Sequence, residues 1–175
     1  DYPVSSIYED HEGLLWIGTN GGGIQKIDRA KKTITVYTTK NGLPNNIING
    51  ILEDDQYNMW ISTTKGLSRF TRSTNVFRNY GQKSGLQSYE FNAGSYYKSS
   101  TGEIYFGGTK GFNRFFPSKV VDNMFIPPVV ITSFKIADRS LDQNGELPLQ
   151  KEVHLGDKVE LSYAENIFSI EFAAL

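Results

Sequence analysis

The chain contains few residues of the types that act as nucleophiles, proton-transfer groups or metal ligands. It has 175 residues, two histidines and no cysteine, which excludes disulfides, thiolate zinc sites and a cysteine nucleophile. His11 and His154 lie far apart, and neither stands in a metalloprotease, serine-hydrolase or phosphate-binding motif. We therefore expect no catalytic residue, no metal site and no cofactor.

One glycine-rich stretch and two acidic stretches remain as candidates for binding chemistry. The glycines in residues 18–23 lack the spacing of a dinucleotide-binding loop, and no helix follows them. The acidic residues in 9–12 and 53–55 could offer oxygen ligands to a hard cation, but their spacing differs from that of an EF-hand. We interpret the first as a structural turn and the other two as solvated turns.

Composition excludes several classes of partner. Eighteen basic and 19 acidic residues give a net charge of −1, so no basic surface for nucleic acid or an anionic membrane is expected. No apolar run reaches membrane-spanning length. Because repeat sequence begins at the first residues, we expect a segment of a longer chain that meets a membrane only through its other parts.

A four-residue motif that occurs three times defines the structural elements that must position any functional side chain. Trp-Ile-Gly-Thr at 16–19 returns as Trp-Ile-Ser-Thr at 60–63 and as Tyr-Phe-Gly-Gly at 105–108. The copies are 44 and 45 residues apart, and such a period indicates an array of equal supersecondary units. Trp16 and Trp60 occupy equal places in apolar strands, so we expect them in the core between units rather than as sugar-stacking platforms.

Each repeat divides into short strands separated by turns. The expected strands are 4–9, 14–19, 23–27 and 33–38 in the first copy, 47–53, 59–63, 66–70 and 76–80 in the second, and 91–98, 103–107 and 111–115 in the third. Four antiparallel strands per unit are typical of a β-propeller blade. In each third strand the apolar residues stand three apart, which indicates either burial on both faces or a bulge.

The sequence therefore predicts an all-β chain: a partial β-propeller of about three four-stranded blades over residues 1–117, then a linker and an incomplete Ig-like β-sandwich segment over residues 118–175. The repeat ends at Pro117, and Pro127-Pro128 indicates an extended linker. The expected strands of this part are 129–136, 152–155, 158–163 and 167–172, and alternating apolar residues in the last two favour half-buried strands. Because closed propellers have about four to eight blades, the remaining blades must come from the parent chain or a second molecule.

These motifs resemble the two-component regulator propeller repeat. The likeness lies in residues 7–10, 13–19 and 22–24, in the connecting Asn-Gly-Leu-Pro-Asn at 41–45, and in the second copy. The third copy resembles the variant last repeat of that family, and residues 127–175 resemble the start of a Y_Y_Y domain. The resemblance implies the periplasmic sensor region of a hybrid histidine kinase, and many members of the family sense oligosaccharides.

Blade geometry predicts where a ligand would lie. Turns between second and third strands share one face of a propeller with the connections between blades, and the other turns lie on the opposite face. Amide, hydroxyl, lysine and tyrosine side chains around a channel suit a neutral or anionic saccharide. The predicted contact residues are Asn20, Asn45, Asn46, Thr64, Lys65, Tyr89, Glu90, Thr109 and Lys110.

The favoured function is thus a non-enzymatic sensor segment that transmits oligosaccharide binding from propeller to kinase. Two other classes stay open. One is a propeller lyase of the streptogramin-lyase type, although His11 falls on the face opposite the predicted ligand residues. The other is a structural dimerisation segment in which two chains pair their open blade stacks, and a homodimer is expected.

Overall fold

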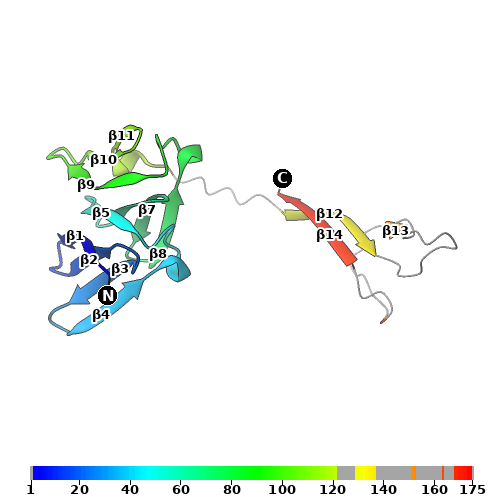
Figure 1. The fold of residues 1–175 in the computed structure, drawn as a ribbon, viewed down its shortest axis with the longest axis horizontal. Helices are drawn as coiled ribbons and strands as arrows, with labels where there is room; N and C mark the ends of the chain where they lie inside the picture. Colours follow the sequence, from blue (N-terminus) through cyan, green and yellow to red (C-terminus); the bar gives the residue numbers. More distant parts are fainter. Residues whose placement is uncertain (1, 122–128, 137–150, 153–162, 164–167, 175) are drawn as a thin grey trace. The chain divides into compact units, whose positions relative to one another are not determined.

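The chain divides into two units, Asp1–Val121 and Asp122–Leu175. A computed structural model describes residues 2–121, 129–136, 151–152, 163 and 168–174 (Figure 1). Over these described residues, no helix has the length and apolar character that crossing a bilayer requires.

Three antiparallel sheets make up the first unit, one for each sequence repeat. The first sheet has the order β1-β2-β3-β4 and the second the order β5-β6-β7-β8, whereas the third has only three strands, in the order β11-β10-β9. The strands are β1 Val4–Glu9, β2 Leu15–Thr19, β3 Ile24–Asp28, β4 Thr33–Tyr37, β5 Ile48–Glu53, β6 Met59–Thr63, β7 Gly66–Thr71, β8 Val76–Tyr80, β9 Phe91–Lys98, β10 Ile104–Gly108 and β11 Gly111–Phe115.

Short 3-10 helices connect or end the sheets. They are η1 Thr39–Asn41, η2 Gln82–Ser84 and η3 Pro117–Lys119. Gly42 and Gly85 end η1 and η2 in the left-handed region that glycine adopts most readily. The expected strands are confirmed with ends shifted by one residue at most within this unit.

The sheets stand side by side with their first strands together (Figure 1). β5 lies against both β1 and β9, and β1 also touches β9. Tyr96 on β9 reaches Ser6 on β1, with the two hydroxyl oxygens 3.1 Å apart. The two side chains Ser5 and Asn49 each donate to a backbone carbonyl at the start of the next sheet, at Ile48 and Phe91. The first strands are therefore the inner strands, as in a propeller.

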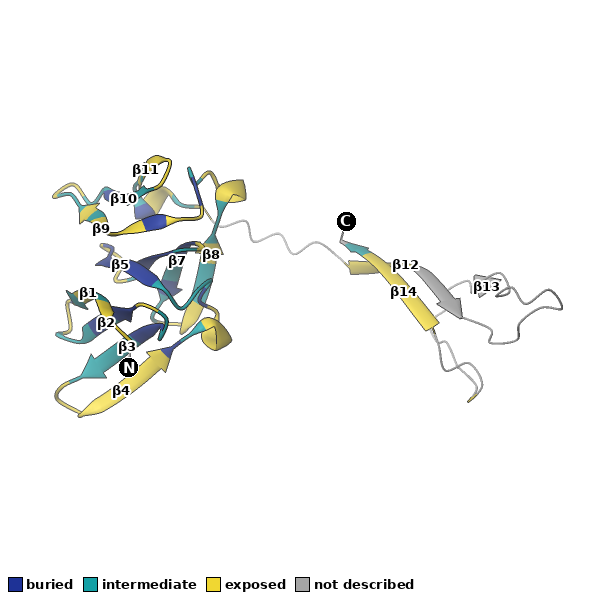
Figure 2. Cartoon of the chain, viewed as in Figure 1, coloured by how far each residue is buried: buried dark blue, intermediate teal, exposed yellow. Residues whose placement is uncertain are grey.

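The core consists of side chains between adjacent sheets. Trp16, Ile48 and Phe70 are buried between the first and second sheets, and Trp60, Phe91 and Phe106 between the second and third. The second sheet is accordingly the most buried of the three (Figure 2). The expectation that both tryptophans belong to the core is confirmed.

Strand register settles the two interpretations of the third strands. β3, β7 and β11 pair with their neighbours without irregularity. The irregularities lie between inner and second strands, at Val4/Ser6, Ile48/Gly50 and Phe106/Gly108. A bulge therefore does not explain the spacing of three between apolar residues in the third strands.

The second unit contains one described sheet of order β13-β12-β14, with β12 Val129–Ile136, β13 Lys151–Glu152 and β14 Phe168–Ala174. Phe168, Ile170 and Phe172 alternate along β14 as expected, yet all three side chains are exposed, because no second layer covers them among the described residues. The linker at Pro127-Pro128, most of the strand expected at 158–163, and His154 lie outside the described residues.

Candidate ligand-binding surfaces

A carboxylate holds the indole of each tryptophan. Asp10 accepts from Trp16 Nε1 at 2.7 Å, and Asp54 accepts from Trp60 Nε1 at 2.8 Å. Both carboxylates also accept backbone N–H groups of their own turn, including those of Leu14 and Asn58. In the first two repeats, the turn between the inner and second strands is therefore fixed to the core by one buried acid.

These carboxylates correct an expectation. Asp10, Glu53 and Asp54 are buried, whereas Glu9, Glu12 and Asp55 are exposed, so the two stretches are only partly solvated. The buried acids accept hydrogen bonds from backbone N–H groups, indoles or the His11 ring, which compensates for their burial. Among the described residues, no cluster of ligands suited to a metal ion is found.

Arg72 joins the first and second sheets through these acids. Its Nη1 lies 3.1 Å from Asp10 Oδ2 and 3.3 Å from Glu53 Oε1, and its Nη2 pairs with Glu12. Asp10 and Glu12 belong to the first repeat, whereas Glu53 and Arg72 belong to the second. The guanidinium is mostly buried and neutralises charge at the boundary between the sheets, where an unpaired carboxylate would be costly.

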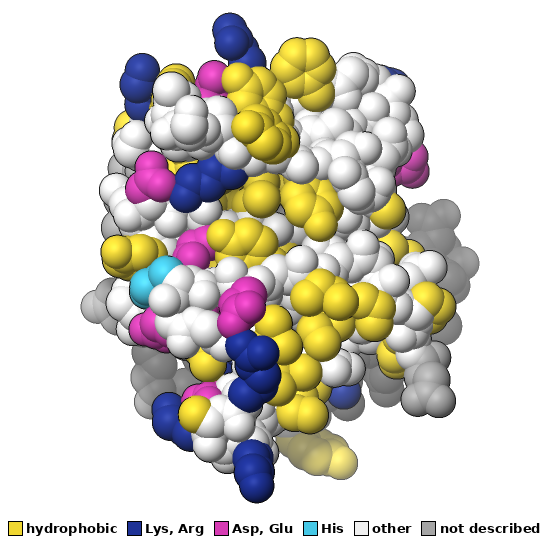
Figure 3. Space-filling view, turned by 90° about the vertical axis from the view of Figure 1, so that its left-hand side faces the viewer, with side chains coloured by type: hydrophobic (Ala, Val, Ile, Leu, Met, Phe, Trp, Pro, Cys, Tyr) yellow, Lys and Arg dark blue, Asp and Glu magenta, His cyan; other side chains and the backbone are white. Residues whose placement is uncertain are grey.

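His11 is part of the same boundary. Its Nδ1 donates to Glu53 Oε1 at 2.6 Å and its backbone N–H donates to Glu53 Oε2 at 3.0 Å. Its ring stacks on Tyr57, with centroids 3.8 Å apart. Figure 3 shows acidic and basic side chains gathered around a histidine on this face. His11 is thus fixed by a carboxylate and an aromatic ring.

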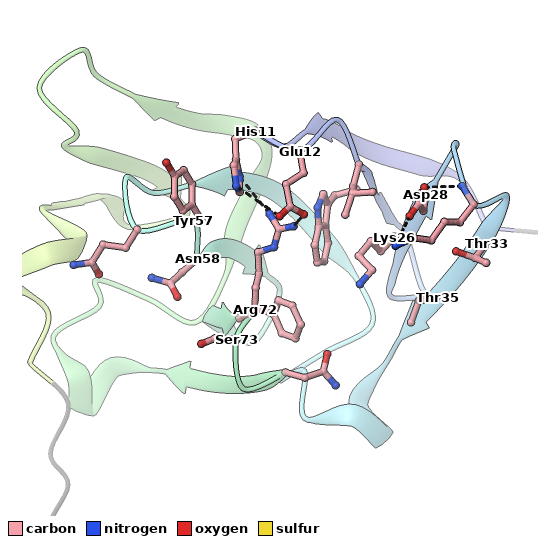
Figure 4. A pocket seen from close by; sticks show the side chains of 16 residues that line it. His11, Glu12, Lys26, Asp28, Thr33, Thr35, Tyr57, Asn58, Arg72 and Ser73 are labelled. Atoms are coloured by element: carbon pink, nitrogen blue, oxygen red, sulfur yellow. Dashed lines mark hydrogen bonds and ion pairs between the residues drawn. The ribbon is translucent and has the colours of Figure 1, made fainter.

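A cleft of about 610 Å³ opens beside this cluster, between the first and second sheets (Figure 4). Its lining from the first sheet includes Lys26, Thr33 and Thr35, and its lining from the second includes Asn58 and Asn75. Hydroxyl, amide and charged groups predominate, so the cleft suits a polar ligand.

The charged groups of the cleft differ in how they are paired. Asp28 accepts from the backbone N–H of Lys31 at 2.9 Å and lies 3.3 Å from its Nζ. The backbone hydrogen bond from Lys31 is the main cause of the lowered pKa of Asp28, so this acid stays ionised. Lys26 Nζ instead lies 5.8 Å from the ring centroids of both Trp16 and Tyr37, and no carboxylate in the described part of the chain pairs with it.

Tyr57 occupies a backbone position that the other two repeats give to glycine. Gly13 and Gly102 stand at the same place in their repeats, with φ of 75° and 82°, and Tyr57 has a φ of 64°. A residue with a bulky side chain rarely adopts this left-handed conformation. The Tyr57 side chain lines the cleft and remains 53% exposed even though His11 covers one face.

The residues predicted from the sequence lie on another surface, here named the connection face. It comprises the β2–β3, β6–β7 and β10–β11 turns with the segments that lead into β5 and β9. Asn20 and Ile47 form an isolated antiparallel β-bridge. In the other two turns, Gly66 N donates to the Tyr89 carbonyl and Thr109 N donates to the Glu90 carbonyl. These contacts bring each turn to a connection, as blade geometry requires.

Some predicted side chains on the connection face serve the backbone. Asn45 Oδ1 accepts from Ile47 N and Asn46 Oδ1 accepts from Thr39 N, both at 2.8 Å. Lys65 and Lys110 are exposed. Exposed or half-buried side chains are also found at Asn20, Thr64, Tyr89, Glu90 and Thr109. The nine residues thus surround the ends of the inner strands, and their role in binding stays a prediction.

The first two repeats match a known family. The sequence profile described as two component regulator propeller matches residues 1–21 and 42–65. A protein named histidine kinase P4, from Formosa agariphila, is 33% identical over 134 residues, which is 76% of this chain and 10% of that protein. The chain spans about a tenth of the length of this curated relative.

Solved structures share the fold. The extracellular domain of a B. thetaiotaomicron protein named as a hybrid two component system is 30% identical with a TM-score of 0.71, covering 98% of this chain and 23% of that chain. Streptogramin B lyase is 13% identical with a TM-score of 0.52, covering 73% of this chain and 42% of that chain. At that identity the lyase shows the architecture alone.

Proposed function

Because the chain carries two-component regulator propeller repeats, we propose that it is a non-catalytic sensor segment of a hybrid two-component histidine kinase and contributes to oligosaccharide sensing. The observation that carries the proposal is the likeness to the extracellular domain of a hybrid two component system over 98% of this chain. The kinase activity would reside in other parts of the whole protein.

The histidine environment favours a binding role over a lyase. A general acid or base must reach its substrate through a free ring nitrogen or a short hydrogen bond. In His11 carboxylates flank both ring nitrogens, with Glu53 2.6 Å from Nδ1 and Glu12 3.9 Å from Nε2. Tyr57 covers one face of the ring. These contacts give His11 a structural role at the boundary between two sheets.

The location that fits this function is the periplasmic side of an inner membrane, as part of a larger membrane protein. In this proposal residues 1–117 supply the last blades of a propeller, and residues 118–175 supply the linker and the first part of a Y_Y_Y domain. Phe116 and Pro117, where η3 begins, form the exit from the last sheet. Signal transmission requires that a ligand bind two arrangements of these parts with different affinity.

Two surfaces can hold the saccharide: the connection face, with Lys65 and Lys110, and the cleft between the first two sheets. A direct test combines an array of neutral, uronic-acid and sulfated oligosaccharides with the full-length protein in membranes. At least one class should bind and change autophosphorylation of the kinase.

The double variant Lys65→Ala/Lys110→Ala of the same protein tests whether the saccharide binds at the connection face. If this face binds the saccharide, the affinity falls about tenfold or more, since contacts to two charged groups are removed. Unchanged affinity removes the connection face from the proposal. Absence of binding by every oligosaccharide on the array contradicts the sensing function itself.

A further inference from the structure

Resting on the proposed sensing function, we propose that the cleft between the first and second sheets binds an acidic oligosaccharide, with Lys26 contacting its carboxylate or sulfate and Tyr57 stacking on a sugar ring. The two side chains come from different repeats and line the same cleft. Figure 4 shows Tyr57 and Lys26 on opposite sides, with Arg72 and Ser73 between them.

One lysine of the cleft can receive an anionic group. Arg72 is paired with three carboxylates, and Lys31 is paired with Asp28. Lys26 has two aromatic rings beneath its ammonium group but no carboxylate partner among the described residues. Among the lysines and arginines that line the cleft, Lys26 is thus the one that no carboxylate pairs in the described part of the chain, and its charge is available to a negatively charged group of a ligand.

Tyr57 supplies the aromatic surface. Trp16 and Phe70 also line the cleft but are fully buried in the core, so they offer no ring face to a ligand. Tyr57 is exposed, and its ring is fixed on one side by His11. Its backbone is left-handed, a conformation that the other two repeats also adopt at this place, but with glycine. Such a conformation, kept where glycine would be easier, points to a use for the side chain.

Between these two residues the cleft presents donors and acceptors. Asn75 accepts from the Tyr37 hydroxyl through its Oδ1 at 3.1 Å, which leaves its amide N–H groups for a ligand. Thr33 and Thr35 are exposed on β4, and Ser73 is exposed in the turn after β7. Spaced hydroxyl and amide groups match the hydroxyls of a sugar chain.

The cleft is formed by two consecutive, complete four-stranded sheets. Its lining residues all come from 11–75, within the first two repeats. Binding therefore requires no other blade, in contrast to a site on the central channel.

The test measures binding to the full-length protein by calorimetry, with tetramers of galacturonic acid, sulfated galactose and neutral galactose as probes. One acidic tetramer should bind more tightly than the neutral one, and its affinity should fall as salt is raised, because the ion pair is screened. Which acidic tetramer binds distinguishes a carboxylate from a sulfate.

Three variants test whether Lys26 and Tyr57 contact the acidic tetramer. Lys26→Gln should weaken binding of the acidic tetramer about tenfold or more, and Lys26→Arg should keep most of it. Tyr57→Gly should weaken binding of the same tetramer while the thermal midpoint is kept or raised, because glycine accepts this backbone. Lys40→Gln, an exposed lysine of η1 outside the cleft, is the control and should bind as the parent does.

The contrary outcomes separate this inference from the sensing function. If Lys26→Gln binds normally while Lys65→Ala/Lys110→Ala does not, sensing stands and the site is the connection face. Preference for the neutral tetramer also overturns the inference and leaves sensing intact. If no tetramer binds and no oligosaccharide on the wider array binds either, both the cleft inference and the sensing function are overturned.

Discussion

At the residue scale, one acid and one indole repeat as a pair. Asp10 with Trp16 and Asp54 with Trp60 have the same donor, the same acceptor and nearly the same distance. In the third repeat Ser99 replaces the acid and accepts the turn N–H of Glu103 at 3.1 Å. Tyr105 replaces the indole and donates its hydroxyl to Glu103 instead. The third turn is therefore closed without a buried charge.

This difference predicts unequal costs for removing the aromatic donor. Trp60→Phe leaves the buried Asp54 carboxylate without its indole partner and opens a small void, so the free energy of unfolding should fall by about 2–4 kcal/mol. Tyr105→Phe removes a hydroxyl at a partly exposed position and should cost much less than Trp60→Phe. Urea denaturation of the full chain measures both. Equal losses would contradict the structural role of the buried acid.

At the element scale, the spacing between sheets depends on small residues in the second strands. A Cβ at Gly18 would lie 2.6 Å from Ile48 Cγ2 of the next sheet. Ser62 occupies the same repeat position in β6, where its buried hydroxyl has no partner among the described groups. The first boundary therefore requires glycine, whereas the second tolerates a side chain.

The two equivalent positions give a matched prediction. Gly18→Ala pushes against the buried, β-branched Ile48 and should lower the free energy of unfolding by about 1–3 kcal/mol. Ser62→Ala removes a hydroxyl that is buried without a partner and should be neutral or stabilising. Thermal denaturation of the two variants beside the parent chain makes the comparison. Stabilisation by Gly18→Ala would mean that the sheets separate freely at this boundary.

At the scale of the whole molecule, the three sheets leave one flank of the first sheet open. Val4 and Ile7 on β1 are exposed, whereas Ile48 and Ile51, at the same repeat positions on β5, are fully buried by the first sheet. The same apolar face is thus covered in one sheet and uncovered in another. A further blade or a second copy of the chain would bury it.

Self-association of the 175-residue chain follows from this open flank. We expect light scattering to report a species of twice the 19.7 kDa chain mass that increases with protein concentration. Val4→Asp/Ile7→Asp should shift the equilibrium to the monomer, since a charge on this face opposes its burial. A monomer at every concentration would contradict pairing through the open flank.

The fold was predictable because its signals are local and repeated. Three sheets, with strand ends correct to within a residue, were predicted from three signals. These are the repeated motif around Trp16 and Trp60, the turn residues, and the early end of the third repeat before Pro117. Packing of both tryptophans followed from their equal places in the period. The connection face followed from strand alternation alone, and its role in binding stays a prediction.

The cleft was not predictable, because its groups come from turns and strands of different sheets. The sequence shows Asp10 and Glu53 as polar turn residues, and only packing of the two sheets reveals that an indole, backbone N–H groups and Arg72 bury them. Comparing repeats could have singled out Tyr57, which replaces a glycine. Its stacking on His11, and the absence of a carboxylate beside Lys26 in the described chain, are decided by tertiary structure. The sequence period determines the strands and turns of each sheet, because those signals are local. The contacts of side chains at a boundary depend on how neighbouring sheets pack, so only the tertiary structure decides them.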